Sequence, residues 1–196
     1  GQISRKLLAE PVQQAEICFH GSFLATGKGH GTDRALVAGL LGLAVDDENI
    51  PNSFAIAAER NLTFSIHGID LGDAHPNTVK MKLTGKSGRT LEIVAASIGG
   101  GQIRICEIDG LTANFCGEYP TLIVHNLDQP GHVTEVTSML AHKSVNIATM
   151  QLYRDSRGGN AVMVIECDQE VPQEAIRWLE HLEGIEKVTY LSLEES

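Results

Sequence analysis

Histidine and asparagine stand two residues apart in the polar stretch of residues 69–78, which contains His75-Pro76-Asn77-Thr78. An imidazole and a carboxamide at this spacing can contact the carboxylate and the ammonium group of a small ligand from one side. Pro76 fixes its own φ and restrains the residue before it, so the segment is stiff. The same residues also suit a plain turn, in which Pro76 starts the reversal and Asn77 caps it. Both interpretations remain open at this point.

Residues 20–42 form a second candidate, with the sequence HGSFLATGKGHGTDRALVAGLLG. Its glycine-rich centre permits a tight turn or a close backbone approach to a ligand. Leucine and valine then recur at helical spacing, which predicts a helix over residues 32–44. Thr32 is predicted to cap this helix, and Asp33 suits the positive end of its dipole. Free N–H groups at such a helix start favour an anion, although a joint of this kind is also common for structural reasons alone.

Cysteine spacing gives no metal-site signature. The four cysteines lie far apart in apolar stretches, whereas zinc and iron–sulfur sites use closely spaced cysteines. We therefore expect reduced, buried thiols and no metal bound by this chain, so that any iron–sulfur cluster must be held by another chain. The eight histidines include no HExxH arrangement and no GxSxG occurs, which disfavours a metal hydrolase and a serine nucleophile. The cysteines are Cys18, Cys106, Cys116 and Cys167.

Composition narrows the class of partner. The chain has 196 residues, of which 42% are hydrophobic and 20% charged, as expected for one globular domain or two small ones. Its net charge of −10 argues against nucleic acid or an anionic membrane as the main partner, because both attract basic surfaces. No apolar run is long enough to span a bilayer, and the first residues do not read as a signal peptide. We expect a cytoplasmic protein. The chain starts without methionine and can be part of a longer one.

The pattern of elements predicts an α+β fold with two domains. The first domain, residues 1–116, should contain helices and then mostly strands, with the apolar strand at 90–98 in the centre of its sheet. An Asp109-Gly110 pair between two strands predicts a hairpin. Its helices are predicted at 3–10, 32–44 and 52–60, and its strands at 14–19, 62–67, 79–84, 90–98, 102–108 and 111–115.

Residues 117–120 are predicted to be a linker, followed by a second domain at residues 121–196. The order strand, helix, strand, strand, helix, strand is that of a ferredoxin-like βαββαβ fold, which by itself supports many functions. The strands are predicted at 121–125, 145–154, 161–167 and 185–193; one helix carries Val133, Val136, Met139 and Leu140 on one face, and the other begins at Pro172 and ends at Gly184.

Three motifs occur in one order: residues 20–42, residues 75–78 and the run Ser97-Ile98-Gly99-Gly100-Gly101. Together they resemble the beta chain of the bacterial iron–sulfur-dependent L-serine dehydratases, whose first part is an allosteric substrate-binding type of domain. The last third of the chain resembles an ACT domain, because residues 128–131, Asp-Gln-Pro-Gly, match the signature turn of that family. The two resemblances cover nearly the whole chain.

The resemblance implies site residues in both domains. In the first domain the serine or effector contacts would be His75, Asn77, Thr78, Gly29, His30, Gly31, Thr32 and Asp33. ACT domains pair side by side and bind small effectors near the signature turn, which implies Asp128, Pro130, Gly131 and His132. Many ACT-like domains only dimerise, so effector binding and simple self-association both stay open for the second domain.

The function that the resemblance implies is that of a beta subunit of L-serine dehydratase, which converts L-serine to pyruvate and ammonia. The partner alpha chain would hold a 4Fe-4S cluster, and this chain would complete the site at the subunit interface. The family's serine-rich, histidine-containing segment would lie upstream of Gly1, so no catalytic base is assigned.

Two alternative functions remain open. One alternative is a non-catalytic serine-sensing module like those on some phosphoglycerate dehydrogenases, and another is a dimerisation scaffold that binds no amino acid. Serine, another amino acid and a monovalent cation all remain possible effectors.

Overall fold

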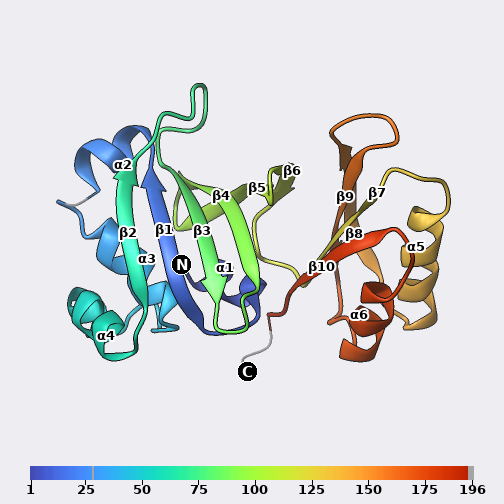
Figure 1. Cartoon of the computed structure of the whole chain (residues 1–196), viewed down its shortest axis with the longest axis horizontal. Coiled ribbons are helices and arrows are strands. Elements are labelled where there is room, and N and C mark those ends of the chain that lie inside the picture. Colours follow the sequence, from blue (N-terminus) through green and yellow to red (C-terminus); the bar gives the residue numbers. More distant parts are fainter. Residues whose placement is uncertain (28, 194–196) are drawn as a thin grey trace. The chain divides into compact units, whose positions relative to one another are not determined.

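The computed structural model of the chain describes residues 1–27 and 29–193, and its contacts divide into two units, Gly1–Gly110 and Leu111–Ser196 (Figure 1). One sheet has six strands in the order β2-β1-β3-β4-β5-β6, and the other has four in the order β10-β7-β9-β8. The last strand of the six-stranded sheet, β6 (Leu111–Phe115), falls within the second unit by its contacts. The two-domain α+β fold is therefore confirmed, while the linker at residues 117–120 stays a prediction.

Alternating burial explains the sheet of the first unit. In β1 (Val12–Phe19), Ala15, Ile17 and Phe19 are buried and the residues between them are more exposed, as in a strand with one covered face. The predicted elements are present with small shifts at their ends. They are α1 (Gln2–Leu8), α3 (Thr32–Leu40), α4 (Ser53–Glu59), β2 (Thr63–Gly68), β3 (Thr78–Gly85), β4 (Thr90–Gly99) and β5 (Gln102–Ile108). A short 3-10 helix that was not predicted, η1 (Ile50–Asn52), directly precedes α4.

Helix packing in the first unit depends on a close approach of α1 and α3. A Cβ atom added at Gly39 of α3 would lie 2.6 Å from the backbone nitrogen of Gln2, so the two helices meet through backbone. Leu7 and Leu8 of α1 and Val37 of α3 are fully buried. The predicted central position of β4 is confirmed, because it lies between β3 and β5.

The stretch after β1 differs from the prediction in two ways. Residues Gly21–Thr26 form a short helix, α2, which the sequence did not indicate because none of its residues is buried and no apolar stripe marks it. Thr32 is not the cap of α3: Gly31, with a φ of 71°, is the N-cap residue and Thr32 is the first helical residue. A positive φ is easiest for glycine, so the glycine takes the capping position. Lys28 of the same motif lies outside the described residues.

The second unit has the predicted ferredoxin-like order. Its elements are β7 (Thr121–Leu127), α5 (His132–His142), β8 (Ile147–Arg154), β9 (Asn160–Cys167), α6 (Gln173–Glu180) and β10 (Ile185–Leu191). Both helices lie on the same side of the four-stranded sheet (Figure 1). Between helices and sheet is a core that includes Leu122, Val136, Leu140, Ile165 and Leu179, each fully buried. No helix within the described residues is long and apolar enough to cross a membrane.

Candidate functional site

Strand register brings three separated motifs together in the first unit. Phe19 of β1 pairs with Val79 of β3, and the ladder continues one step beyond the strand, where the His20 N–H donates to the Thr78 carbonyl at 3.0 Å. Thr78 pairs with Ala96 of β4, and one step further the Ser97 N–H donates to the Asn77 carbonyl at 2.9 Å. The ends of β1, β3 and β4 thus place all three motifs at one edge of the sheet.

Gly21 and Pro76 make the closest contact in this junction. The Ser22 N–H donates to the Pro76 carbonyl at 2.7 Å, and a Cβ atom on Gly21 would lie only 2.5 Å from the same oxygen. Gly21 also has a φ of +56°, which a side chain disfavours. Both the conformation and the space at this position therefore require glycine.

His20 opens the motif of residues 20–42 but was not among the predicted ligand contacts. Its side chain is buried, and its Nδ1 accepts a hydrogen bond from the Leu71 N–H at 3.1 Å. A neutral imidazole that accepts at Nδ1 carries its proton on Nε2, which is then available as a donor. The only signal in the sequence was a histidine that directly follows a strand and precedes a glycine.

The residues of the His75 loop divide into accessible and buried side chains. His75 is exposed, its Nδ1 accepts from the Asn77 N–H at 3.1 Å, and the side chain of Asn77 is half-buried. Thr78 is buried, and its hydroxyl donates to the His75 carbonyl at 2.6 Å. The geometry therefore leaves the His75 ring and the Asn77 amide accessible, while the Thr78 hydroxyl fixes the loop. The ligand contacts assigned to these three residues stay a prediction.

Residues 29–33 lie at the turn between α2 and α3. The Thr32 N–H donates to the Gly27 carbonyl at 2.9 Å, the Arg34 N–H to an Asp33 carboxylate oxygen at 2.8 Å, and the Ala35 N–H to the Gly31 carbonyl at 2.9 Å. These bonds occupy much of the helix start that was predicted to receive an anion. Across the described parts of the chain, no hydrogen bond joins residues 29–33 to residues 75–78. Ligand contacts at Gly29, His30, Gly31, Thr32 and Asp33 stay a prediction.

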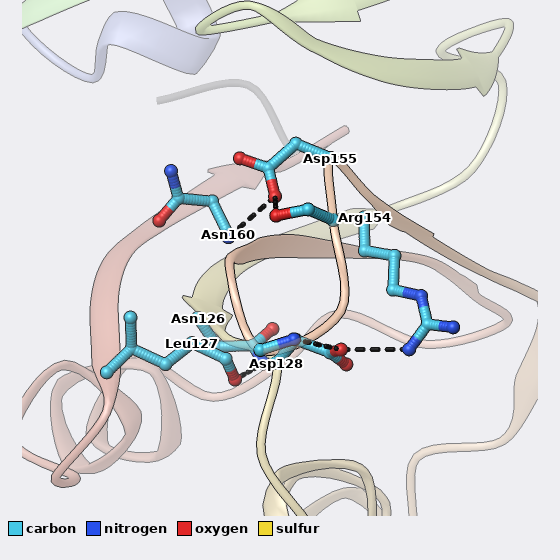
Figure 2. A network of polar contacts seen from close by, with 8 residues as sticks. Asn126, Leu127, Asp128, Arg154, Asp155 and Asn160 are labelled. Carbon is cyan, nitrogen blue, oxygen red and sulfur yellow. Dashed lines mark hydrogen bonds and ion pairs between the residues drawn. The ribbon is translucent and has the colours of Figure 1, made fainter.

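In the second unit, the side chain of Asp128 is already engaged. One of its carboxylate oxygens accepts from Arg154 Nη1 at 2.9 Å and from the Gly158 N–H at 3.0 Å, and its own N–H donates to the Gly159 carbonyl at 2.8 Å. Figure 2 shows this contact between the loop after β7 and the turn that joins β8 to β9. The Gly158 N–H and the Arg154 guanidinium lower the pKa of Asp128 below its usual range. Asp128 therefore clamps two loops together.

Two buried polar atoms, one on β7 and one on the first residue of α5, have no partner within the described residues. They are Asn126 Oδ1 and His132 Nε2. His132 Nδ1 lies 3.1 Å from a carboxylate oxygen of Glu135, and the other side of the ring packs on Gly184, where a Cβ atom would lie 2.5 Å from Nε2. If Nδ1 donates to Glu135, then Nε2 is an acceptor like Asn126 Oδ1. Two buried acceptors favour a ligand or water that brings donors.

Pro130 and Gly131 are exposed and complete the predicted effector turn. Gly131 has a φ of 110° and precedes the first residue of α5, so the turn presents the N–H groups of the helix start. These groups suit an anion such as a carboxylate. Effector contacts at Asp128, Pro130, Gly131 and His132 stay a prediction.

The cysteines do not fit an iron–sulfur cluster. All four thiols are free; burial raises the pKa of the Cys18 and Cys106 thiols and raises that of Cys167 to about 11. Only Cys167 is buried and the other three thiols are partly exposed, so the expectation of buried thiols is wrong for these three. Among residues 1–27 and 29–193, no group of three or more histidine, cysteine, aspartate or glutamate side chains is arranged to hold a metal ion.

Comparisons with known proteins agree with the motif order. A family model described as "Serine dehydratase beta chain" matches residues 1–107. A "Probable L-serine dehydratase, beta chain" of Bacillus subtilis is 34% identical over 192 residues, which is 98% of this chain and 87% of that protein. The "L-serine dehydratase, beta chain" of Peptoniphilus asaccharolyticus is 34% identical over 172 residues, covering 87% and 78%. A D-3-phosphoglycerate dehydrogenase of Methanocaldococcus jannaschii is 28% identical over 98% of this chain but only 36% of its own length.

Proposed function

Because the chain belongs to the serine dehydratase beta-chain family, we propose that it is the beta subunit of an L-serine dehydratase and forms pyruvate and ammonia from L-serine together with an alpha subunit. The observation that carries the proposal is the junction of the three motifs at the ends of β1, β3 and β4. A junction held by backbone bonds can present side chains to a ligand in a fixed geometry.

The first domain, residues 1–116 in this proposal, binds the amino acid. The exposed ring of His75 and the amide of Asn77 contact its carboxylate and ammonium group, and the hydroxyl of Thr78 holds the loop through the His75 carbonyl. His20 offers an Nε2 proton from the same junction. Residues 29–33 would approach the amino acid from the neighbouring turn.

The alpha subunit holds the 4Fe-4S cluster in this proposal, since the thiols of this chain do not fit one. The cluster supplies Lewis-acid chemistry toward the serine hydroxyl. This chain orients the amino acid and, by itself, forms no pyruvate. The free thiols support a cytoplasmic location.

The second domain, residues 121–196 after the linker at 117–120, is regulatory in this proposal. An effector amino acid would place its carboxylate at the N–H groups of the start of α5. Self-association would use β8, an edge strand in which Leu152 is 51% exposed.

The serine-sensing alternative is not favoured by the comparisons. The D-3-phosphoglycerate dehydrogenase relatives match at lower identity, and the chain covers only 26–37% of their length, 36% in the Methanocaldococcus jannaschii enzyme. The dimerisation-scaffold alternative predicts no amino-acid binding and is separated from the proposal by experiment.

The first experiment is an anaerobic assay of pyruvate formation from L-serine, with the natural full-length chain alone, the alpha subunit alone and their mixture. Activity only in the mixture supports the proposal. A mixture that contains an intact cluster and forms no pyruvate contradicts it.

The second experiment measures thermal unfolding of this chain with and without L-serine. A ligand that binds only the folded state stabilises it by about 2.7 kcal/mol at a hundred times its dissociation constant. His75→Ala and Asn77→Ala should abolish the serine-induced shift. His67→Ala, which removes an exposed histidine of β2, is the matched control and should keep the shift. A shift that persists in both site variants contradicts the assignment of the site.

A further inference from the structure

An apolar groove runs between α5 and α6 on the outer side of the helix layer. Its volume is about 610 Å³, and its floor consists of Met139, which is 7% exposed, and Ala175, which is 1% exposed. Trp178 forms one wall. The groove touches the effector turn only through Glu135, whose carboxylate lies 3.1 Å from His132 Nδ1, and it includes no residue of the turn itself or of β8, so neither part of the proposed function accounts for it.

Trp178 is the single tryptophan of the chain, and 48% of it is exposed. Its neighbours on α6, Ile176 and Leu179, are buried in the core, so Trp178 belongs to the outward side of the same helix. Exposed aromatic side chains beside an apolar pocket are characteristic of protein–protein contacts.

The charges along the groove are spaced for a helix and not for a small molecule. Glu135 lies in the first turn of α5, while His142 and Lys143 lie at its end. Glu135 and the C-cap residue Lys143 are eight positions apart, which is about 12 Å along the helix axis at 1.5 Å per residue. A small ligand pocket would instead need polar groups that converge on one point. Here the polar groups lie on the exposed rim.

This order of charges is complementary to itself. When two copies of α5 lie antiparallel about a two-fold axis, the acidic start of each helix faces the basic end of the other. The axis passes between Ser138 and Met139, midway between the charged ends, where the small Ser138 side chain allows close approach. Within one copy, Lys143 already pairs with Glu174. Glu135 of the second copy would join this pair and form a charge network beside His142 of the first copy. An interface that joins identical patches in this way is isologous.

We propose that the α5–α6 groove is occupied by a second copy of this chain, packed antiparallel along α5, with Trp178 of each copy seated in the groove of the other. The contact is independent of pairing along β8. A chain that uses both contacts forms a tetramer with two kinds of two-fold axis.

The test uses Trp178 as a local probe in the full chain. Its fluorescence emission and its quenching by acrylamide are recorded over a range of protein concentrations, with the mass measured in parallel by light scattering. Burial of the indole predicts a blue shift and weaker quenching as the concentration rises. Leu152→Asp on β8 should leave this optical change intact even if it lowers the mass, which separates the groove from the β8 contact.

Charge-exchange variants identify the partner. Glu135→Lys and Lys143→Glu should each abolish the concentration-dependent blue shift, and the double variant should regain it because opposite charges face each other again. Glu180→Lys makes the same charge change on α6 outside the groove and should behave like the wild type. The proposal is overturned if wild-type emission does not change with concentration, if both single variants keep the shift, or if the shift appears only when the alpha subunit is added.

Discussion

The His75 loop in the first unit and the Asp128 loop in the second differ in how far their polar side chains are engaged by distant parts of the chain. The His75 loop is held by backbone bonds to residues 20–22 and to Ser97, and by two bonds within the loop at His75 Nδ1 and the Thr78 hydroxyl, which leaves the exposed part of the His75 ring and the Asn77 amide accessible. The Asp128 loop is held in part by the Asp128 side chain itself, which binds Arg154 and the Gly158 N–H. A side chain that already holds the fold has less capacity for a ligand. Ligand recognition by side chains is thus better supported in the first unit.

The same contrast applies to the atoms that remain available. In the second unit these are N–H groups at the start of α5 and two buried polar atoms, Asn126 Oδ1 and His132 Nε2. Backbone N–H groups bind an anion without regard to residue type, whereas an imidazole and an amide at fixed positions distinguish donor from acceptor. We therefore expect the first unit to discriminate more sharply between amino acids than the second.

The largest expected effect comes from Gly21→Ala. The new Cβ would lie 2.5 Å from the Pro76 carbonyl oxygen and the residue would keep a φ of +56°, so we expect a loss of roughly 2–4 kcal/mol in the free energy of unfolding. The displaced junction should also abolish the serine-induced thermal shift. Urea unfolding and thermal unfolding with serine measure the two effects.

Gly72→Ala is the control for this variant. Gly72 also has a positive φ, +60°, but a Cβ there meets no atom within 4 Å. It should cost only the conformational strain, about 1–2 kcal/mol, and keep the serine response. If Gly21→Ala and Gly72→Ala behave alike, the contact with Pro76 does not hold the site.

A smaller effect is expected for Thr78→Val, which keeps the shape of the side chain and removes the hydroxyl that donates to the His75 carbonyl. The loss of this bond should lower the free energy of unfolding by roughly 1–2 kcal/mol. The serine-induced shift should become smaller without vanishing, because Thr78 positions the loop and its hydroxyl is already used. Complete loss of the shift in a folded variant would instead make Thr78 a ligand contact, as first predicted.

Much of this fold follows from local signals in the sequence. The alternation of apolar and polar residues and the turn at residues 85–88 predict the β3–β4 hairpin. In the next hairpin, Asp109 and Gly110 adopt positive φ values of 50° and 80°, as such a pair does in tight hairpins. The hairpin register alone would have placed Asn77 beside Ser97. The adjacency of His20 and Thr78 could not be predicted in the same way, because β1 and β3 are not consecutive and their pairing depends on the whole sheet.

The Asp128 clamp was beyond sequence reasoning for a similar reason. Its partners, Arg154 and Gly158, are 26 and 30 residues away in the chain and reach it only when the β8–β9 turn folds toward the loop after β7. The signature turn at residues 128–131 suggested that Asp128 contacts a ligand. The hydrogen bonds that its carboxylate makes depend instead on the tertiary structure, which the sequence motif does not reveal. Helix α2 was missed because a short exposed helix has no apolar stripe to reveal it.

The smallest expected effect is the pH dependence of the clamp. The pKa of Asp128 is lowered in the folded chain, first by the Gly158 N–H and then by Arg154. The ionised carboxylate therefore stabilises the fold at a pH above its unfolded pKa of about 3.9, and this contribution is lost as the pH falls through the lower folded pKa. Wild type should have a higher urea midpoint than Asp128→Asn at pH 6, with the difference shrinking below about pH 4.

Arg154→Gln separates the two donors in this last experiment. It removes the guanidinium and keeps the Gly158 N–H, which is the first cause of the lowered pKa. The midpoint of Arg154→Gln should therefore fall between those of the wild type and Asp128→Asn, with the same direction of pH dependence. If Asp128→Asn matches the wild type at every pH, the carboxylate does not stabilise the fold. It would then be free to contact an effector, and the contrast between the two loops would disappear.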